Sequence, residues 1–115
     1  MGNINRELVA ASSKMIILSI LSIEDNYGYQ ILESLKTFTE GFWEWKEGML
    51  YPMLHKMEKD QLLKSYWTET PSGKKRKYYH ITDIGTKALE TEKSEWEFVN
   101  QTLSKLWRIH HASQQ

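Results

Sequence analysis

The stretch from residue 47 to residue 63 constrains the fold of this 115-residue chain more than any other. Its apolar residues recur at steps of three and four, which places them on one face of an α-helix. Pro52 is tolerated in the first turn of a helix but disrupts the interior, so we expect the helix to begin near residue 48 or 49 and to end near residue 60. The face expected to pack on the core carries Leu50, Met53, Leu54 and Met57.

The opposite face of this helix is aromatic and basic, with Tyr51, His55, Lys56 and Lys59. A short helix with such a face suits the major groove of DNA, which is about 12 Å wide. The alternative is an ordinary amphipathic helix whose charged face is only solvated. The helix alone does not decide between these interpretations, and the residues that follow it favour the first.

Composition excludes several kinds of protein. The chain has no cysteine, so a disulfide framework and a cysteine zinc site are excluded, and its four histidines lack the spacing of a metal site. We therefore expect no metal and no cofactor. The sequence shows neither a nucleophile arrangement nor a glycine-rich phosphate loop, which argues against an enzyme. The longest apolar run, residues 15–23, is too short to span a bilayer and the N-terminus has no signal-peptide pattern, so we expect a cytoplasmic protein without a membrane partner.

The charges of the chain are balanced in number but not in position. Overall, 15 Lys and Arg stand against 15 Asp and Glu, whereas residues 51–80 hold seven basic and three acidic residues. Four consecutive basic residues, 74–77, directly follow the turn signal Pro71-Ser72-Gly73. Because strand-forming residues flank this turn, at 62–70 and 74–81, the pattern predicts a β-hairpin with a basic tip. Lysines also protect edge hairpins from aggregation, but four consecutive cations exceed that need and are more typical of nucleic-acid binding.

Three further helices complete the expected architecture. We expect the first over residues 5–23, with apolar residues on two sides, and the second over residues 27–38, with Asn26 as its N-cap. The aromatic segment 42–45 should be extended, and the last helix should begin at residues 82–83 and run for about 25 residues. This order predicts a mainly α protein with a small β-hairpin: a winged helix-turn-helix domain at residues 5–81 and a C-terminal dimerisation helix at residues 82–111.

The last helix carries a heptad-like apolar seam. Leu89, Trp96 and Leu103 are seven residues apart, and Val99 and Leu106 follow the last two by three residues. A long helix at the end of a small domain cannot bury such a seam on its own core, so we expect a second copy of the chain to cover it. All five residues are therefore predicted to form a homodimer interface.

Several motifs follow one another in fixed order over residues 22–85. They are Tyr27-Gly28-Tyr29 at the start of the second helix, Leu50-Tyr51-Pro52 and Leu54 to Lys59 in the third, and Lys75-Arg76-Lys77-Tyr78-Tyr79 in the hairpin, followed by Ile81-Thr82 and Gly85. Together these motifs resemble those of the PadR-like family of transcriptional regulators. The family more often has glycine where this chain has Gln61, directly after the third helix.

The resemblance implies a homodimeric, sequence-specific DNA-binding regulator, which we expect to act as a repressor on a pseudo-palindromic operator in double-stranded DNA. Tyr51 and His55 would contact bases or sugars, and the lysines would contact phosphates. Two roles are open for Arg76, which would either contact DNA or pair with Glu58. The predicted DNA-binding residues are Tyr27, Tyr51, His55, Lys56, Lys59, Lys74, Lys75 and Lys77.

The short chain with a single C-terminal helix further resembles a small subgroup of the family that includes multidrug-sensing repressors. That resemblance implies that a planar aromatic molecule stacks on a tryptophan at the dimer interface, and Trp96 stands at the corresponding position. Met15 and Val99 are its expected neighbours in the ligand site. The alternative for Trp96 is a packed dimer core. The alternative for the whole chain is a winged-helix protein–protein interaction module that does not bind DNA.

Overall fold

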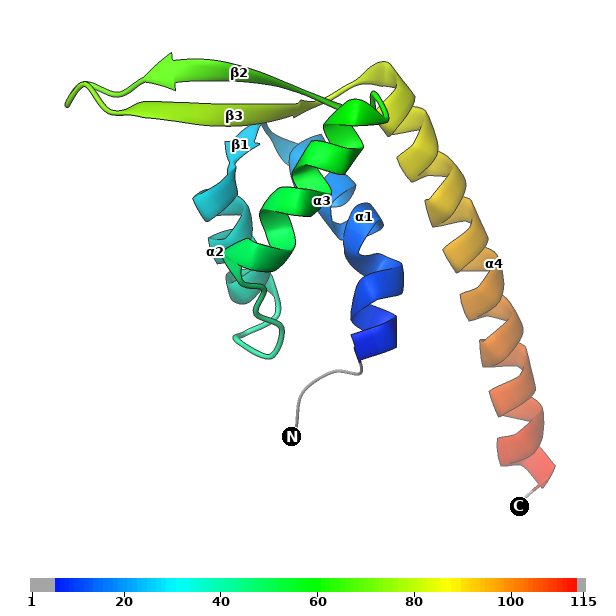
Figure 1. The fold of residues 1–115 in the computed structure, drawn as a ribbon. Helices are drawn as coiled ribbons and strands as arrows, with labels where there is room; N and C mark the ends of the chain where they lie inside the picture. The colour runs from blue at the N-terminus through cyan, green and yellow to red at the C-terminus, as the bar shows by residue number, and fades with distance from the viewer. Residues whose placement is uncertain (1–5, 114–115) are drawn as a thin grey trace.

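Four helices and a small sheet make up the structure, a computed structural model that describes residues 6–113 and the side chains of residues 7–109 (Figure 1). This arrangement confirms the predicted fold class, mainly α with a small β-hairpin and a long C-terminal helix. The expected first residue of the first helix, Asn5, lies outside the described residues. In chain order the elements are α1 (Arg6–Ile23), β1 (Asn26–Tyr27), α2 (Gly28–Phe38), α3 (Glu47–Lys59), β2 (Leu63–Glu69), β3 (Lys75–Ile81) and α4 (Asp83–Ser113).

The sheet has three antiparallel strands in the order β1-β3-β2. β2 and β3 form the predicted hairpin, with Leu63 opposite Ile81 at its base and Glu69 opposite Lys75 near its tip. The third strand was not predicted. Asn26, expected to cap α2, instead pairs with Tyr79 in this strand and is buried. Residues 42–45, expected to be extended, form no strand: residues 42 and 43 make a bend, and residues 44–46 lead from it into α3.

The start of α3 differs from the prediction by one or two residues. The helix begins at Glu47, so Pro52 lies in its second turn rather than its first. A proline there removes the backbone hydrogen bond that would end on the carbonyl four residues earlier, which is that of Gly48. Because Gly48 is exposed at the start of the helix, water can replace the lost donor, and the helix continues through Pro52.

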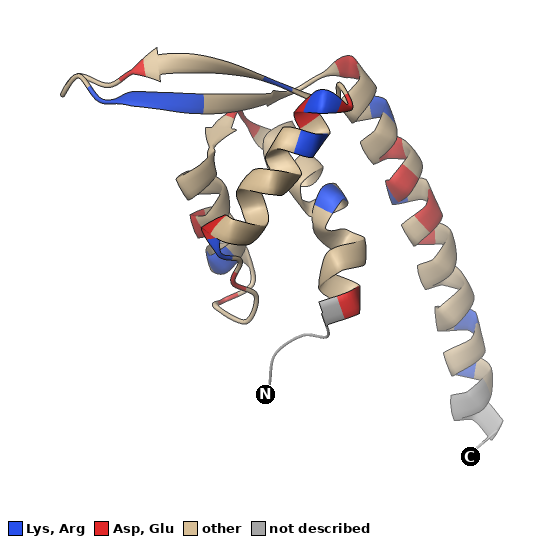
Figure 2. Ribbon diagram, in the orientation of Figure 1, with Lys and Arg blue, Asp and Glu red and all other residues tan. Residues whose placement is uncertain are grey.

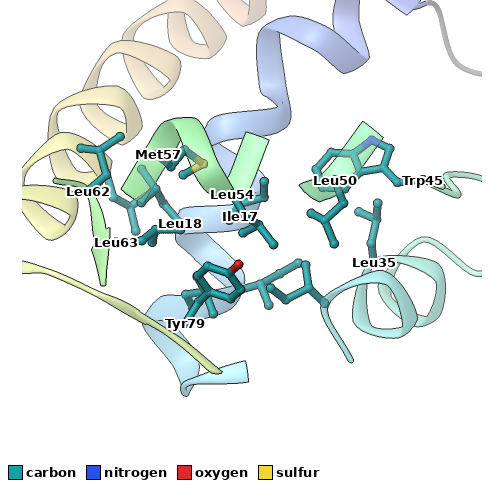
Figure 3. Packing of buried hydrophobic residues seen from close by; sticks show 14 residues of the cluster. Ile17, Leu18, Leu35, Trp45, Leu50, Leu54, Met57, Leu62, Leu63 and Tyr79 are labelled. Atoms are coloured by element: carbon teal, nitrogen blue, oxygen red, sulfur yellow. The ribbon is translucent and has the colours of Figure 1, made fainter. Parts of the chain in front are cut away.

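The core lies where α1, α2 and α3 meet the inner face of the sheet (Figure 3). Helical spacing correctly predicted the buried side of α3, since Leu50, Leu54 and Met57 are buried. Tyr79 is the largest fully buried side chain and comes from β3. From α1, α2 and the loop before α3 the core receives Ile17, Leu18, Ile20, Leu21, Ile31, Leu35 and Trp45.

The C-terminal end of α3 is held by two backbone hydrogen bonds of the Schellman type. The Leu62 amide donates to the Met57 carbonyl at 2.9 Å, and the Gln61 amide donates to the Glu58 carbonyl at 3.0 Å. This motif needs a left-handed residue, and Gln61 has φ of 65°. Glutamine is sterically strained in this conformation because of its Cβ atom, whereas glycine is not.

Gln61→Gly should therefore raise the free energy of unfolding by about 1 kcal/mol, because the relief of strain exceeds the added flexibility of the unfolded chain. Urea unfolding followed by circular dichroism measures the change. Lys93→Gly, at an exposed position inside α4, is the matched control and should lower stability by about 1 kcal/mol. Equal destabilisation by both variants would contradict the role given to the left-handed residue.

α4 is longer than expected, with 31 residues. Its first half packs along α1, where Lys14 Nζ lies 2.8 Å from Glu92 Oε1, and its second half stands clear of the other elements (Figure 1). The molecule is accordingly elongated, with principal extents of 65, 33 and 22 Å. Within residues 6–113, no helix combines the length and apolarity needed to cross a membrane.

Candidate nucleic-acid interface

A groove of about 620 Å³ separates α3 from the wing, the hairpin formed by residues 63–81. The turn of the wing is closed by Thr70 and Lys74, whose backbone groups bond at 2.8 Å, and Gly73 supplies the positive φ of 85° that the turn requires. Six of the eight residues predicted to bind DNA line this one groove: Tyr27, Tyr51, His55, Lys74, Lys75 and Lys77.

The remaining two predicted residues, Lys56 and Lys59, lie on α3 outside the groove and are exposed. Lys56 Nζ lies 3.3 Å from Asp60 Oδ2, a solvent-exposed pair of the kind that contributes little to stability. Figure 2 shows both groups of cations, one along the outer half of β3 and one at the end of α3 next to the base of the wing. The basic residues thus frame the groove from two sides.

Strand alternation explains which wing residues face the groove. Lys75, Lys77 and Tyr79 share one face of β3, and Tyr79 on that face is buried in the core. Trp67 on β2 is the cross-strand partner of Lys77 and also lines the groove. Trp67 is not among the residues predicted to bind DNA, although the alternation of the two strands places it beside the lysines.

Glu58 links α3 to both strands of the wing. Its carboxylate accepts a hydrogen bond from Ser65 Oγ at 2.5 Å and lies 3.8 Å from Lys77 Nζ. The pairing left open for Arg76 is therefore made by Lys77 instead. The reason is again alternation, since Arg76 lies on the opposite face of β3, with its guanidinium carbon 4.5 Å from the centre of the Tyr27 ring. Beside Tyr27, Arg76 also lines the groove.

The outer face of the sheet carries a row of tyrosines. The Tyr78 ring lies 5.3 Å from that of Tyr27 and 5.7 Å from that of Tyr66, so one ring from each strand takes part. Tyr27 thus has a structural role besides lining the groove. The row fixes β1, and with it the start of α2, against the wing.

One glycine lets Tyr51 approach the start of α2. A Cβ atom on Gly28 would lie 2.6 Å from Tyr51 Oη, closer than real atoms come. The ring of Tyr51 therefore rests against the backbone of Gly28, and its exposed edge borders the groove. This contact gives a physical reason for the glycine of the Tyr27-Gly28-Tyr29 motif.

A cluster of three polar side chains ties the base of the wing to the turn after α1. Asp25 accepts a hydrogen bond from Tyr66 at 2.6 Å, and its other oxygen lies 2.7 Å from His80 Nδ1. Burial alone would raise the pKa of Asp25, but the bonds from Tyr66 and His80 outweigh it, and the pKa lies below 3.8. The bond to Asp25 raises the pKa of Tyr66 to about 12.

The cluster should make stability depend on pH at both extremes. Asp25 has a lowered pKa, so its contribution is present above pH 3.8 and is lost as pH falls through the folded value. Tyr66 has a raised pKa, so its contribution is complete below pH 10 and is lost as pH rises towards 12. Asp25→Asn should be less stable than the wild type at pH 7, and this difference should shrink at pH 3 and at pH 11.

Urea unfolding at the three pH values measures that difference. Asp60→Asn serves as the control, because its carboxylate is paired only at the surface of α3 and its effect should be small at every pH. If the effect of Asp25→Asn were the same at pH 3, 7 and 11, ionisation of the cluster would not contribute to stability.

An apolar pocket of about 400 Å³ lies on another side of the molecule, between α1, the end of α2 and α4. Two of the three predicted ligand contacts, Met15 and Trp96, line it, whereas Val99 lies outside the lining. Ile16, Ile20 and Phe38 supply much of the remaining wall.

The predicted seam of α4 divides into two parts. Leu89 is only 5% exposed and belongs to the core of its own chain, so it presents almost no surface to a partner. Trp96, Val99 and Leu106 are exposed, and Leu103 is half-buried. Beyond the seam, α4 also exposes Phe98, Trp107 and Ile109.

Comparison with known proteins decides the family. The family model described as "Transcriptional regulator PadR-like family" matches residues 17–91, which include α2, α3 and the whole wing. The chain belongs to the PadR-like family of transcriptional regulators. This membership confirms the resemblance found in the sequence and the expectation that the chain is not an enzyme. The comparisons identify the family but do not assign the chain to the multidrug-sensing subgroup.

Solved structures of transcriptional regulators share both fold and sequence with the chain. A PadR-like transcriptional regulator from Bacillus cereus is 36% identical, with a TM-score of 0.77 over 87% of this chain and 95% of that one. A transcriptional regulator from Clostridium thermocellum is 32% identical, with a TM-score of 0.76 over 86% of this chain and 96% of that one. The transcriptional regulator YqjI of Escherichia coli is 27% identical over 90 residues, which are 78% of this chain and 42% of YqjI.

Proposed function

We propose that this PadR-like regulator is a homodimeric repressor that binds a pseudo-palindromic operator through α3 and the wing. The observation that carries the proposal is the groove itself, where Tyr51 and His55 from α3 face Lys75 and Lys77 from the wing. A partner that fits three wing lysines beside an aromatic helix face is polyanionic. This chemistry supports DNA over the alternative, a protein–protein interaction module.

Each part of the interface has a distinct role in this proposal. α3 enters the major groove, where Tyr51 and His55 contact base edges or sugars. Lys74, Lys75 and Lys77 contact phosphates on one flank, and Lys56 and Lys59 contact phosphates on the other. The bond between Glu58 and Ser65 holds the wing at a constant distance from α3, so that the contacts of the helix and of the wing act together.

The dimer rests on three exposed seam residues of α4. Trp96, Val99 and Leu106 are exposed on α4, and the last two lie in the half of the helix that stands clear of its own domain (Figure 1). A second copy related by a two-fold axis would cover them and would present both recognition helices to one side of the DNA. Half-sites about one helical turn apart, roughly 34 Å, would then match the protein.

The salt dependence of DNA binding tests the electrostatic part of the proposal. If each subunit meets about four phosphates, the dimer displaces counterions from about eight, and log K should fall against log salt with a slope near −7. Fluorescence anisotropy with the DNA immediately upstream of the protein's own gene, titrated at several salt concentrations, gives this slope. A slope near zero would reject the phosphate contacts.

The apolar pocket supports induction by a planar aromatic ligand. A ligand stacked on Trp96 at the dimer interface would favour one spacing of the two recognition helices and thereby shift DNA affinity. We expect such compounds to quench tryptophan fluorescence of the wild type and Trp96→Ala to abolish the response. Trp107→Ala is the matched control, because Trp107 is exposed on the same helix outside the pocket lining and its removal should leave the response in place. A response that survived in Trp96→Ala would remove Trp96 from the site.

A further inference from the structure

Trp67 is an exposed tryptophan in the middle of the wing. It is 66% exposed and stands on β2, where four of the seven residues are exposed and only Leu63 is buried. It lines the groove between α3 and the wing together with Lys75, and the same two residues also line a second pocket beside Thr68 and Glu69. None of the roles described above uses Trp67.

The fold itself gives no reason for an indole at this position. β2 is an edge strand of the sheet, and a large apolar side chain left open on an edge strand favours aggregation. The nearest cross-strand partner is Lys77, so the polar neighbour offers Trp67 no apolar cover. A partner outside the domain would supply that cover.

The surroundings of Trp67 indicate the chemistry of this partner. Lys75 and Lys77 lie on the same face of the sheet, so the partner must carry negative charge next to an apolar surface. The backbone of DNA has this character, since each phosphate is followed by a deoxyribose with an apolar C–H face. An apolar protein surface would match the indole but would leave the charge of Lys75 uncompensated, whereas Lys77 already lies 3.8 Å from the Glu58 carboxylate.

We propose that Trp67 packs its indole against deoxyribose on the DNA strand that passes between α3 and the wing. This inference rests on the proposed DNA-binding function and adds a positioning contact to it. The sugar is favoured over a base because Trp67 lies on the wall of the groove, in the third register pair from the turn, and not at the tip formed by residues 71–73. The contact orders the backbone for the lysines and does not read sequence.

Two duplexes and four proteins test the inference. The duplexes are the DNA immediately upstream of the protein's own gene and a shuffled sequence of the same composition. The proteins are the wild type, Trp67→Ala, Trp67→Phe and the control Trp107→Ala. Trp107 lies on α4 and, at 63%, is about as exposed as Trp67. Affinity is measured by fluorescence anisotropy at several salt concentrations.

We expect Trp67→Ala to weaken binding to both duplexes by about tenfold, the scale of a lost aromatic contact with nucleic acid. Trp67→Phe keeps a flat apolar ring and should stay within about threefold of the wild type. The salt slope should not change in either variant, because an apolar contact releases no counterions. Trp107→Ala should bind like the wild type, and all variants should keep the wild-type melting temperature.

Three results would overturn the inference. Equal affinities for Trp67→Ala and Trp107→Ala would mean that the indole does not touch DNA. A loss confined to one duplex would mean that Trp67 reads bases, and a shallower salt slope would mean that it acts through phosphate. If the wild type itself bound neither duplex, the proposed function would fail, which separates that outcome from a failure of the Trp67 contact alone.

Discussion

Gly85→Ala should lower the free energy of unfolding by about 2 kcal/mol, although alanine is the better helix former. A Cβ atom at this position would overlap the carbonyl oxygen of Leu62 and would lie 2.8 Å from Ile81 Cγ1. The carbonyl belongs to the backbone and is also the acceptor of the Thr82 amide at 3.0 Å, so it cannot move without breaking that bond. Overpacking of this kind lowers the free energy of unfolding by about 1–3 kcal/mol, which is more than the higher helix propensity of alanine adds to it.

The effect reaches beyond one contact, because this is the point where α4 is attached to the wing. Thr82 Oγ1 donates to the Gln61 carbonyl at 2.6 Å and accepts from the Gly85 amide at 3.0 Å, so the end of α3, the end of β3 and the start of α4 meet here. A displaced α4 would carry its exposed apolar side chains to a different place. Weaker self-association of Gly85→Ala is therefore expected in addition to the loss of stability.

Gly48→Ala is the matched control for this prediction. Gly48 also lies in the first turn of a helix, but nothing lies within 4 Å of the position of its Cβ. Alanine there should raise the free energy of unfolding by about 0.5–1 kcal/mol, since only helix propensity changes. Urea unfolding of both variants measures the difference. If Gly85→Ala were at least as stable as the wild type, the Leu62 carbonyl would have moved to make room for the Cβ atom, and the prediction would be wrong.

The double variant Lys74→Ala, Lys75→Ala should bind DNA about 10²–10³-fold more weakly than the wild type at 0.15 M salt. The slope of log K against log salt should become shallower by about 3–4, because a dimer would lose four phosphate contacts. Both lysines are exposed and line the groove at the outer end of the wing. Because phosphate contacts carry no sequence information, the loss should be equal for the upstream DNA and for a shuffled duplex.

The matched control removes the same charge elsewhere. Lys93 and Lys105 are exposed on α4, away from the groove, and their joint replacement by alanine should change affinity far less. Equal losses in the two double variants would mean that net charge, and not local contact, attracts DNA. A loss by the wing variant that affected only the upstream DNA would mean that Lys74 or Lys75 reads bases.

Features with a strong local cause were predictable from the sequence. The three- and four-residue spacing around Leu54 predicted the buried side of α3, and Pro71-Ser72-Gly73 predicted the turn of the wing. Both signals act within a few residues, so they do not depend on the rest of the fold. They were sufficient to bring six of the eight predicted DNA contacts into one groove.

Features that arise from contacts between distant residues were not predictable in the same way. Strand β1 has two residues, and only its pairing with β3 distinguishes Asn26 from an ordinary helix cap. The burial of Leu89 depends on where α4 crosses the domain, which heptad spacing does not reveal. Lys77, by contrast, could have been preferred over Arg76 as the partner of Glu58, since alternation along β3 places Lys77 on the same side as the buried Tyr79.

Hydroxyl-radical footprinting on the DNA immediately upstream of the protein's own gene tests the central proposal most directly. If a homodimer presents two copies of α3 and the wing to one side of the duplex, two protected regions should appear about 10 base pairs apart, with protection of the flanking backbone by the wings. A single protected region, or the absence of protection at low salt, would contradict the proposal.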